Sequence, residues 1–524
     1  MKNKLPVLMI VLGLFIAVIS IFADSIGLGG RGGIPALQIL GAEAGIAFAL
    51  AGMGLKIYQQ HREPSPMGSA RDLVGWVLDQ PILTWMLIGF IVAYVICFLA
   101  PAIYNPGHKF QYFTNYLYER EKVGFDTRLV LEHIGHWYLR DQTPKYLYPP
   151  LTTVLFTPLW LLRFPYNYYV VTVVTLVSYL MLNLLLPLLF NKKENKLLII
   201  FIFAVSIFSY GLQFELETGQ FYTLAMLLSM AAIYIFHRHP SYRIFAYILF
   251  CISVQFKIFP AIFIFLFVDD WRDWKANLKR FAALGLANFL LLFLLGFSYL
   301  QLFIARLFTS RYNLEALYNH SIKVFVINLA ASGYGLPEGA LLDWIRAHAA
   351  LIQTSLYAYV LICFLAILIG SCLRNQRGVN FSLLMVCLIM GITLPSISHD
   401  YNLPLLAAPF ALLMSAQRLR DNRWVKAVSI ALIGAASFAY AVTLFPSNAR
   451  PAFLENSFPA LFVLLTAVTL LSFMQKDNSH MQAGINDIQY FTKKYRSGDF
   501  SRILAERLKS LLRFRDLLIL RNQR

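Results

Sequence analysis

The chain has 524 residues, of which 58% are hydrophobic and only 14% are charged. An average soluble domain carries about 25% charged residues, so this composition excludes an ordinary soluble enzyme and indicates an integral membrane protein. The net charge of +18 does not indicate nucleic-acid binding, because the basic residues lie in short segments between apolar runs and in the C-terminal tail. That distribution is typical of the cytoplasmic loops of membrane proteins.

The apolar runs predict an all-α polytopic membrane protein with about 13–14 transmembrane helices, since roughly 20 apolar residues cross a bilayer as a helix. Single spans are expected near residues 5–22, 36–55, 81–101, 167–190, 197–211, 220–236, 281–306, 350–371, 380–397, 403–416, 424–445 and 457–474. The run 243–268 has basic residues on both flanks, which predicts two short helices that meet near Lys257 and Pro260. Residues 151–163 are too short for an ordinary span and are expected to form a re-entrant or tilted helix that lines a cavity.

Three regions are expected along the chain. Residues 1–75 form an accessory two-span hairpin with a polar linker, residues 76–475 form the main membrane domain, and residues 476–524 form a basic tail. Leucines of the tail gather on one side of a predicted helix, which is typical of an amphipathic helix on an anionic leaflet, and a solvated basic tail is the equally weighted alternative. The positive-inside rule places this tail in the cytoplasm and the polar loops 102–150, 212–219, 307–349 and 398–402 on the opposite face.

These outer loops contain the residues with useful chemistry. The first loop is nearly fifty residues long, and its apolar residues predict an interfacial amphipathic helix over 125–140 with Asp126 near its N-terminus. The short predicted turn over 212–222 adds Glu217 and Gln220. The remaining outer loops add further polar residues, namely Arg311, Asn319, His320, His399 and Asp400.

Lys257 is the one lysine expected at membrane depth. An ionisable group there costs a few kcal/mol unless it lines water or meets an anion. Snorkelling to the interface is the alternative, and we favour an anion. His133 and His136 have the spacing of two metal ligands on a helix, but no third ligand is fixed by spacing. We therefore expect no cofactor, with a divalent metal as the alternative.

Transfer of a sugar from a lipid-linked phosphate suits an outer cavity with an acid at its rim and a buried cation. A carboxylate can act as general base on the acceptor hydroxyl. Lys257 and Arg311 can stabilise the charge that develops on the phosphate leaving group. A helix parallel to the membrane can position the acceptor while the bundle holds the prenyl chain.

Five segments occur in an order that resembles a known family. They are Asp126 followed by Tyr146-Leu-Tyr148-Pro-Pro-Leu151, Gly219-Gln220, Gln255-Phe-Lys257-Ile-Phe-Pro260, Asn319-His-Ser321 and Ser398-His-Asp-Tyr401. Over about residues 81–475 the chain resembles the membrane glycosyltransferases of the GT-C fold. In particular, it resembles glycosyltransferase family 87, the polyprenyl-phosphomannose-dependent mannosyltransferases. This resemblance implies a GT-C-like bundle whose large first extracytoplasmic loop is catalytic.

The resemblance also implies roles for individual residues. Asp126 would be the catalytic base, Lys257 would meet the donor phosphate, and Gln220 and Asn319 would line the sugar site. Further substrate contacts are expected from Tyr148, Glu217, His320, His399 and Asp400, and a second phosphate contact from Arg311.

The expected activity is inverting transfer of a hexose, with mannose as the expected sugar, from a polyprenyl-phosphate donor to a lipid, glycan or protein acceptor. The expected location is a bacterial cytoplasmic membrane, with the site facing the periplasm or exterior. Two alternatives remain at this point: a glycan ligase or polymerase of the O-antigen type, and a flippase or transporter of lipid-linked sugars. The paired prolines and the Gly-Gln turn argue against the first, and the lack of repeated halves argues against the second.

Overall fold

A computed structural model describes residues 82–94, 123–139, 148–190, 196–207, 209–309, 319–332, 336–416, 423–444 and 456–474, with a few positions between 8 and 16. All regular structure in these ranges is helical. The first half of the chain contains α4 (Ile82–Tyr94), α6 (Phe125–Leu139), α7 (Pro150–Trp160), α8 (Tyr166–Leu180), the π-helical turn η2 (Met181–Leu185), α9 (Leu186–Phe190), α10 (Lys196–Ile207), α11 (Tyr210–Thr218), α12 (Tyr222–Arg238), the 3-10 turn η3 (Pro240–Tyr242) and α13 (Arg243–Phe256). The second half contains the 3-10 segment η4 (Phe259–Leu266), α14 (Trp274–Leu291), α15 (Phe297–Thr309), α16 (Ile322–Ala330), α17 (Ala340–Arg374), α18 (Phe381–Thr393), the 3-10 segment η5 (Asp400–Leu406), α19 (Ala407–Ala416), α20 (Arg423–Leu444) and α21 (Phe458–Met474).

The centre of the bundle is formed by α18 and α19. Neither helix has a charged residue, and nearly every side chain in both is buried. A helix that is apolar on all sides needs other helices around it. Helices α10, α17 and α21 supply those neighbours, while α12 packs along α13, and α20 packs along α21 and α4.

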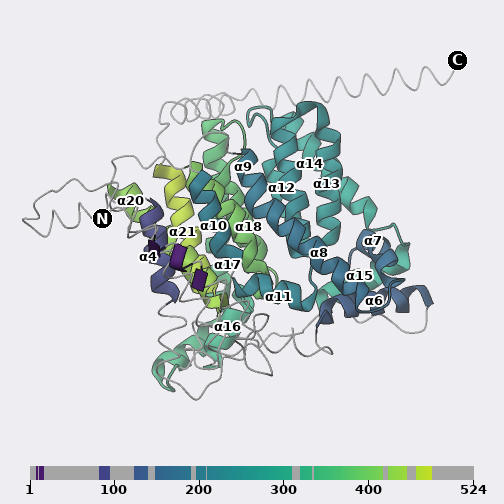
Figure 1. The fold of residues 1–524 in the computed structure, drawn as a ribbon, viewed down its shortest axis with the longest axis horizontal. Coiled ribbons are helices and arrows are strands. Elements are labelled where there is room, and N and C mark those ends of the chain that lie inside the picture. The colour runs from purple at the N-terminus through teal and green to yellow at the C-terminus, as the bar shows by residue number, and fades with distance from the viewer. Residues whose placement is uncertain are drawn as a thin grey trace, which may run out of the picture.

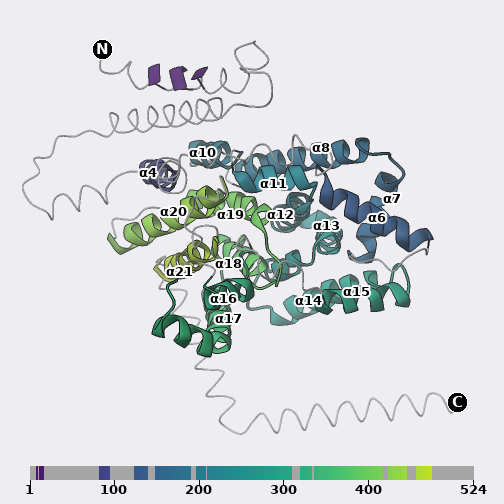
Figure 2. The same ribbon diagram turned by 90° about the horizontal axis from the view of Figure 1, so that it is seen from below.

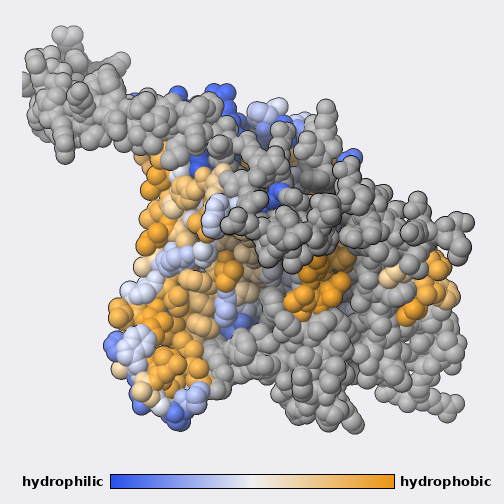
Figure 3. Space-filling model, turned by 90° about the vertical axis from the view of Figure 1, so that its left-hand side faces the viewer, coloured by the Kyte–Doolittle hydropathy of each residue, from blue (hydrophilic) through white to orange (hydrophobic). Residues whose placement is uncertain are grey.

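The outer surface of the bundle is suited to lipid. Two helices of the described residues, Tyr166–Phe190 and Ala340–Arg374, are long and apolar enough to cross a membrane, and several shorter helices are also apolar. Many large apolar side chains on α8 and α17 are exposed. Figure 3 shows a broad apolar surface on one side of the molecule, with hydrophilic residues towards its upper and lower ends. An exposed apolar surface of this extent fits a helical membrane protein.

The short elements from the predicted outer loops meet at one end of this bundle. Helices α6, α11 and α16 lie at the lower end in Figure 1, across the ends of the long helices. Helix α11 contacts both α6 and η5, and Figure 2 shows this end from below. Four loops that are far apart in the sequence therefore converge on one region.

Several sequence predictions agree with the structure. The amphipathic helix expected over 125–140 is α6, with Asp126 in its first turn. The run 243–268 breaks at Lys257, where α13 ends and η4 begins with Pro260 near its start. Proline lacks the N–H that a continuing α-helix needs, which explains a break at this position.

Other boundaries were wrong. The single span expected over 281–306 is two helices, α14 and α15, separated at Gly296, which has a φ of +88°. The span expected over 350–371 begins ten residues earlier, as part of the 35-residue helix α17. The turn expected over 212–222 is mostly helix α11, and the span expected over 403–416 begins with the 3-10 segment η5. The basic tail and most of the N-terminal hairpin lie outside the described residues.

Candidate active site

The side chain of Gln220 contacts both Asp126 and Lys257, the acid and the cation predicted from the sequence. The Lys257 ammonium donates a hydrogen bond of 2.8 Å to Oε1 of Gln220. The side chain of Gln220 also hydrogen-bonds the Asp126 carboxylate, as does the Thr218 side chain. Asp126 and Lys257 thus both contact one amide side chain, that of Gln220.

Lys257 is enclosed by aromatic rings. Its Nζ atom lies 3.9 Å from the ring centroid of Tyr222, 4.5 Å from that of Phe221 and 4.6 Å from that of Tyr148. It also donates a 3.3 Å hydrogen bond to the Tyr148 hydroxyl. Aromatic faces stabilise a cation without neutralising it. No carboxylate of the described residues forms an ion pair with Lys257, so its positive charge remains available to an anion.

Two glycines bring α6 against the turn that follows α11. Gly219 has a φ of +71°, and its carbonyl accepts a 2.6 Å hydrogen bond from the Thr127 hydroxyl. A Cβ atom at Gly219 would overlap that hydroxyl. Gly124, with a φ of +69°, donates a 2.7 Å backbone hydrogen bond to the Glu217 carbonyl and packs on the Tyr168 ring. Left-handed backbone without a side chain is the property of glycine that this close contact requires.

The second carboxylate near Lys257 is Glu215, which is fully buried. Its oxygens accept hydrogen bonds from the backbone N–H of Thr223 (2.7 Å) and from the Thr223 hydroxyl (2.5 Å). Burial raises the pKa of Glu215 to about 7, against the opposing effect of these hydrogen bonds and of the Lys257 charge. Glu215 is therefore engaged by the start of α12.

Burial also changes the proton affinity of Asp126. Loss of solvent raises the pKa of Asp126 above 3.8, while its hydrogen bond to Gln220 and the charge of Lys257 oppose that rise. Burial likewise raises the pKa of Tyr148 well above 10, so this hydroxyl stays protonated. A carboxylate with a raised pKa is a stronger base towards a hydroxyl than a fully solvated one.

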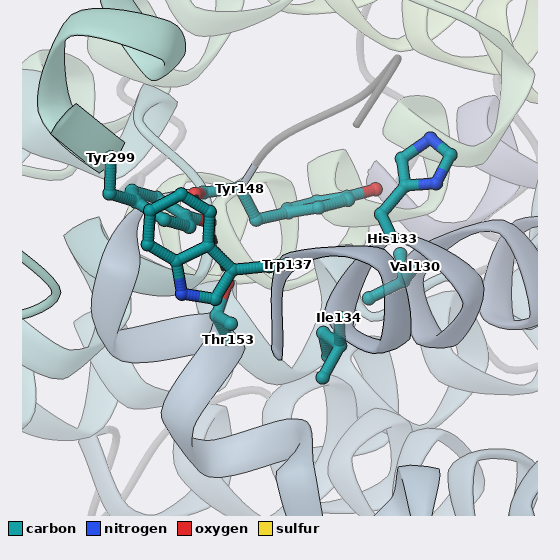
Figure 4. Close-up of a pocket in the computed structure, with 7 residues that line it drawn as sticks. All are labelled: Val130, His133, Ile134, Trp137, Tyr148, Thr153 and Tyr299. Carbon is teal, nitrogen blue, oxygen red and sulfur yellow. Dashed lines mark hydrogen bonds between the residues drawn. The ribbon is translucent and has the colours of Figure 1, made fainter. Parts of the chain in front are cut away.

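A small hollow lies behind Tyr148. Figure 4 shows the rings of Trp137, Tyr148 and Tyr299 gathered beside Val130, His133 and Ile134 of α6. The Tyr299 hydroxyl donates to the Tyr148 carbonyl (2.8 Å) and bonds the Thr153 hydroxyl (2.6 Å). These contacts fix the position of Tyr148, whose own hydroxyl faces Lys257.

The predicted residues from the later loops form a separate polar cluster. His320 Nε2 lies 2.9 Å from the Asp400 carboxylate, and both side chains are buried. The other ring nitrogen of His320 accepts a hydrogen bond from the Ser457 backbone N–H, so Nε2 carries the proton that Asp400 accepts. Asn319 binds the Ser396 carbonyl and accepts from the Ser398 backbone N–H. This cluster ties together the segments before α16, η5 and α21.

The two groups of residues are adjacent. Tyr401, the neighbour of Asp400, stacks on Tyr222 with ring centroids 4.7 Å apart and hydrogen-bonds its hydroxyl. His399 packs edge-on against Tyr401. The Tyr222 and Tyr401 rings thus lie between Lys257 and the polar cluster of Asn319, His320 and Asp400. The described hydrogen bonds of that cluster join the loops to one another.

The remaining predicted residues lie elsewhere. Glu217 is buried beside Tyr168, on the opposite side of α11 from Glu215. Arg311 lies outside the described residues. Within the described ranges no cluster of three or more histidine, cysteine, aspartate or glutamate side chains could hold a metal ion.

Sequence reasoning missed two rings of this site, those of Phe221 and Tyr222, and named Tyr401 only as the last residue of a motif. Aromatic residues make up 15% of the chain, so a ring carries little signal by itself. The useful signal was position, because Phe221 and Tyr222 directly follow Gly219-Gln220 at a helix start.

Comparison with known proteins places this helical protein in a class of enzymes, the glycosyltransferases. Residues 146–395 match the model of glycosyltransferase family 87, which confirms the resemblance inferred from the motifs. The matched region contains Tyr148, Gln220 and Lys257, while Asp126 precedes it. No curated protein and no solved structure gives a significant match to the chain.

Proposed function

We propose that the protein is an inverting glycosyltransferase that moves a hexose, expected to be mannose, from a polyprenyl-phosphate donor to an acceptor hydroxyl at the outer face of a bacterial cytoplasmic membrane. The observation that carries this proposal is the link Asp126–Gln220–Lys257. It brings a carboxylate and an ammonium group to one amide side chain, at one end of a bundle that has an apolar exterior.

In the proposed reaction Asp126 and Lys257 have different roles. Asp126 accepts the proton of the acceptor hydroxyl as the acceptor oxygen bonds to the anomeric carbon of the sugar. The bond from that carbon to the phosphate oxygen breaks, and its electron pair remains on the phosphate. Lys257 stabilises the charge gained by the phosphate, and the polarity of Gln220 orients both groups. Attack opposite the leaving phosphate inverts the anomeric configuration.

The aromatic surroundings of Lys257 suit this role. Three rings, including that of Tyr148, whose hydroxyl also accepts a hydrogen bond from the ammonium, replace the water that would otherwise solvate it. A cation in such a site interacts more strongly with an incoming phosphate than a solvated one does, because the local dielectric constant is lower. The phosphate would remain joined to an apolar chain, which the lipid-facing side of the bundle can accommodate.

The test compares Asp126→Asn with Glu132→Gln in the purified enzyme. Glu132 lies on the same helix but is exposed, and it contacts only His136 among its described partners. Donors are polyprenyl phosphates with a radiolabelled hexose, and acceptors are lipid and glycan extracts of the membrane.

Loss of a general base lowers turnover by about 10²–10⁴-fold, so Asp126→Asn is expected to lose transfer while Glu132→Gln keeps it. Turnover close to the unmodified rate in Asp126→Asn contradicts the assignment of the base. Transfer of a preassembled glycan in place of a single hexose would favour a ligase. Anomeric NMR of the product tests inversion.

A further inference from the structure

Glu215 makes three hydrogen bonds to a segment of four residues, Gln220 to Thr223. Its backbone carbonyl accepts from the Gln220 N–H at 3.0 Å. Its carboxylate accepts from the backbone N–H of Thr223 at 2.7 Å and from the Thr223 hydroxyl at 2.5 Å. One residue of α11 therefore fixes both ends of the stretch 220–223.

This arrangement supplies a helix cap from outside the helix. The first N–H groups of any α-helix have no partner within the helix. The N-cap residue of α12 is Phe221, whose side chain accepts no hydrogen bond. The Glu215 carboxylate takes that role, and a negative group is favoured at a helix N-terminus.

The stretch held in this way carries the groups that face Lys257. Gln220 contributes the amide oxygen at 2.8 Å from Nζ, and Phe221 and Tyr222 contribute two of the three rings around it. A shift of the 220–223 backbone would move all three groups together. Misplacement by about an ångström is enough to lower catalysis by roughly 10²-fold.

We propose that Glu215 is a positioning residue, which holds Gln220 and the rings around Lys257 in register with Asp126 by binding both ends of the 220–223 stretch. This inference rests on the proposed function. It also separates the roles of the two carboxylates near Lys257. Both oxygens of Glu215 are occupied by Thr223, and the side chain is fully buried, whereas Asp126 is partly exposed.

The test uses three variants: Glu215→Gln, Glu215→Ala and Thr223→Val. Glutamine keeps an oxygen that accepts from the Thr223 N–H and an amide that can donate to its hydroxyl, so transfer is expected to stay within about threefold of the unmodified enzyme. Alanine leaves a buried N–H without a partner, which is expected to lower kcat/KM by about 10–100-fold. Thr223→Val removes one of the two carboxylate contacts and is expected to lower it by about 3–10-fold.

The outcomes distinguish positioning from chemistry. Rescue by glutamine together with loss in alanine supports positioning, because a general base is not replaced by an amide. Inactive Glu215→Gln with an active Asp126→Asn would make Glu215 the base and would overturn both proposals. Unmodified kinetics in Glu215→Ala and in Thr223→Val would overturn the positioning role alone, since Asp126→Asn tests the reaction separately. Thermal unfolding of each variant in detergent identifies any that fails to fold, and Thr223→Val, which keeps the N–H contact, then carries the test.

Discussion

The contact between Gly219 and Thr127 yields the most specific prediction of this structure. Gly219 ends α11 in the left-handed region and precedes Gln220, and Thr127 lies in the first turns of α6 beside Asp126. Replacing Gly219 by alanine places a methyl group against the Thr127 hydroxyl. The substitution therefore tests the contact between Gly219 and Thr127, which brings Asp126 close to Gln220.

The cost has two components. A left-handed backbone costs a non-glycine residue about 1–2 kcal/mol. Displacing the Thr127 hydroxyl removes a buried hydrogen bond that contributes about 0.5–1.5 kcal/mol. Together they predict a loss of about 1.5–3.5 kcal/mol in the free energy of unfolding. Gly296 offers a matched control, because its φ is +88° but nothing lies within 4 Å of an added Cβ atom.

The assay is thermal unfolding of the purified variants in detergent, together with transfer kinetics. Gly219→Ala should unfold at a lower temperature than Gly296→Ala and should lose transfer activity as Gln220 shifts. Adding Thr127→Ala to Gly219→Ala should cost less than the sum of the two single changes, because the overlapping hydroxyl is gone. Equal unfolding temperatures for Gly219→Ala and Gly296→Ala, with full activity, would refute the close contact.

Four further outcomes follow from the site. Lys257→Met is expected to lower kcat by about 10²–10³-fold, since it removes the charge that we propose faces the donor phosphate, whereas Lys275→Met at an exposed position should leave turnover unchanged. Gln220→Leu breaks the bridge from acid to cation and is expected to lower kcat/KM by about 10–100-fold. Because only ionised Asp126 accepts a proton and burial raises its pKa, kcat should fall as pH decreases through a value above 3.8, and Gln220→Leu should move that limb to higher pH. His320→Ala removes the hydrogen-bond donor to the buried Asp400 carboxylate and is expected to lower stability by about 1–3 kcal/mol, measured by thermal unfolding.

The same pKa predicts a stability effect with a definite sign. A group whose folded-state pKa is raised stabilises the fold when protonated, and that contribution is lost as pH rises through the folded pKa. At about pH 7.5 the ionised Asp126 is therefore a cost that Asp126→Asn avoids. The unfolding temperature of this variant should equal or exceed that of the unmodified enzyme, and a clear decrease would contradict the pKa shift.

Local patterns were sufficient to predict the elements that carry the acid and the cation. The apolar spacing around Asp126 predicted α6, and Pro260 together with basic flanks predicted the break at Lys257. That Asp126 and Lys257 lie on the same side of the membrane was predicted from the basic residues of the loops, which set the orientation of the spans. The predictions of α6 and of the break at Lys257 depend only on residues close to each other in the sequence, so one sequence is enough to make them.

Longer-range contacts were not predictable in this way. The Glu215 cap on α12 depends on how α11 turns at Gly219, and sequence suggested a turn where the structure has a helix. The pairing of His320 with Asp400 depends on two loops that meet only after the bundle has packed. These residues could be identified as polar and outer, but not as partners.

Two span boundaries failed for local reasons. Gly296 lies within a nearly continuous run of leucine and phenylalanine, so hydropathy gave no sign of the break between α14 and α15. The start of α17 is polar, and Arg346 binds Glu338 there at 2.9 Å, so this part resembled a loop. Helical propensity of its alanines and leucines outweighs that polarity.

The central claim is that Asp126 and Lys257 flank the bond that is broken. A structure of the enzyme with a polyprenyl-phosphate sugar bound, in the Asp126→Asn variant to prevent turnover, tests it most directly. In that structure we expect the donor phosphate to contact Lys257 Nζ and the sugar to lie between the phosphate and residue 126. A phosphate bound away from Lys257, for example among the arginines that surround Asp269 where α13 and α14 begin, would contradict it.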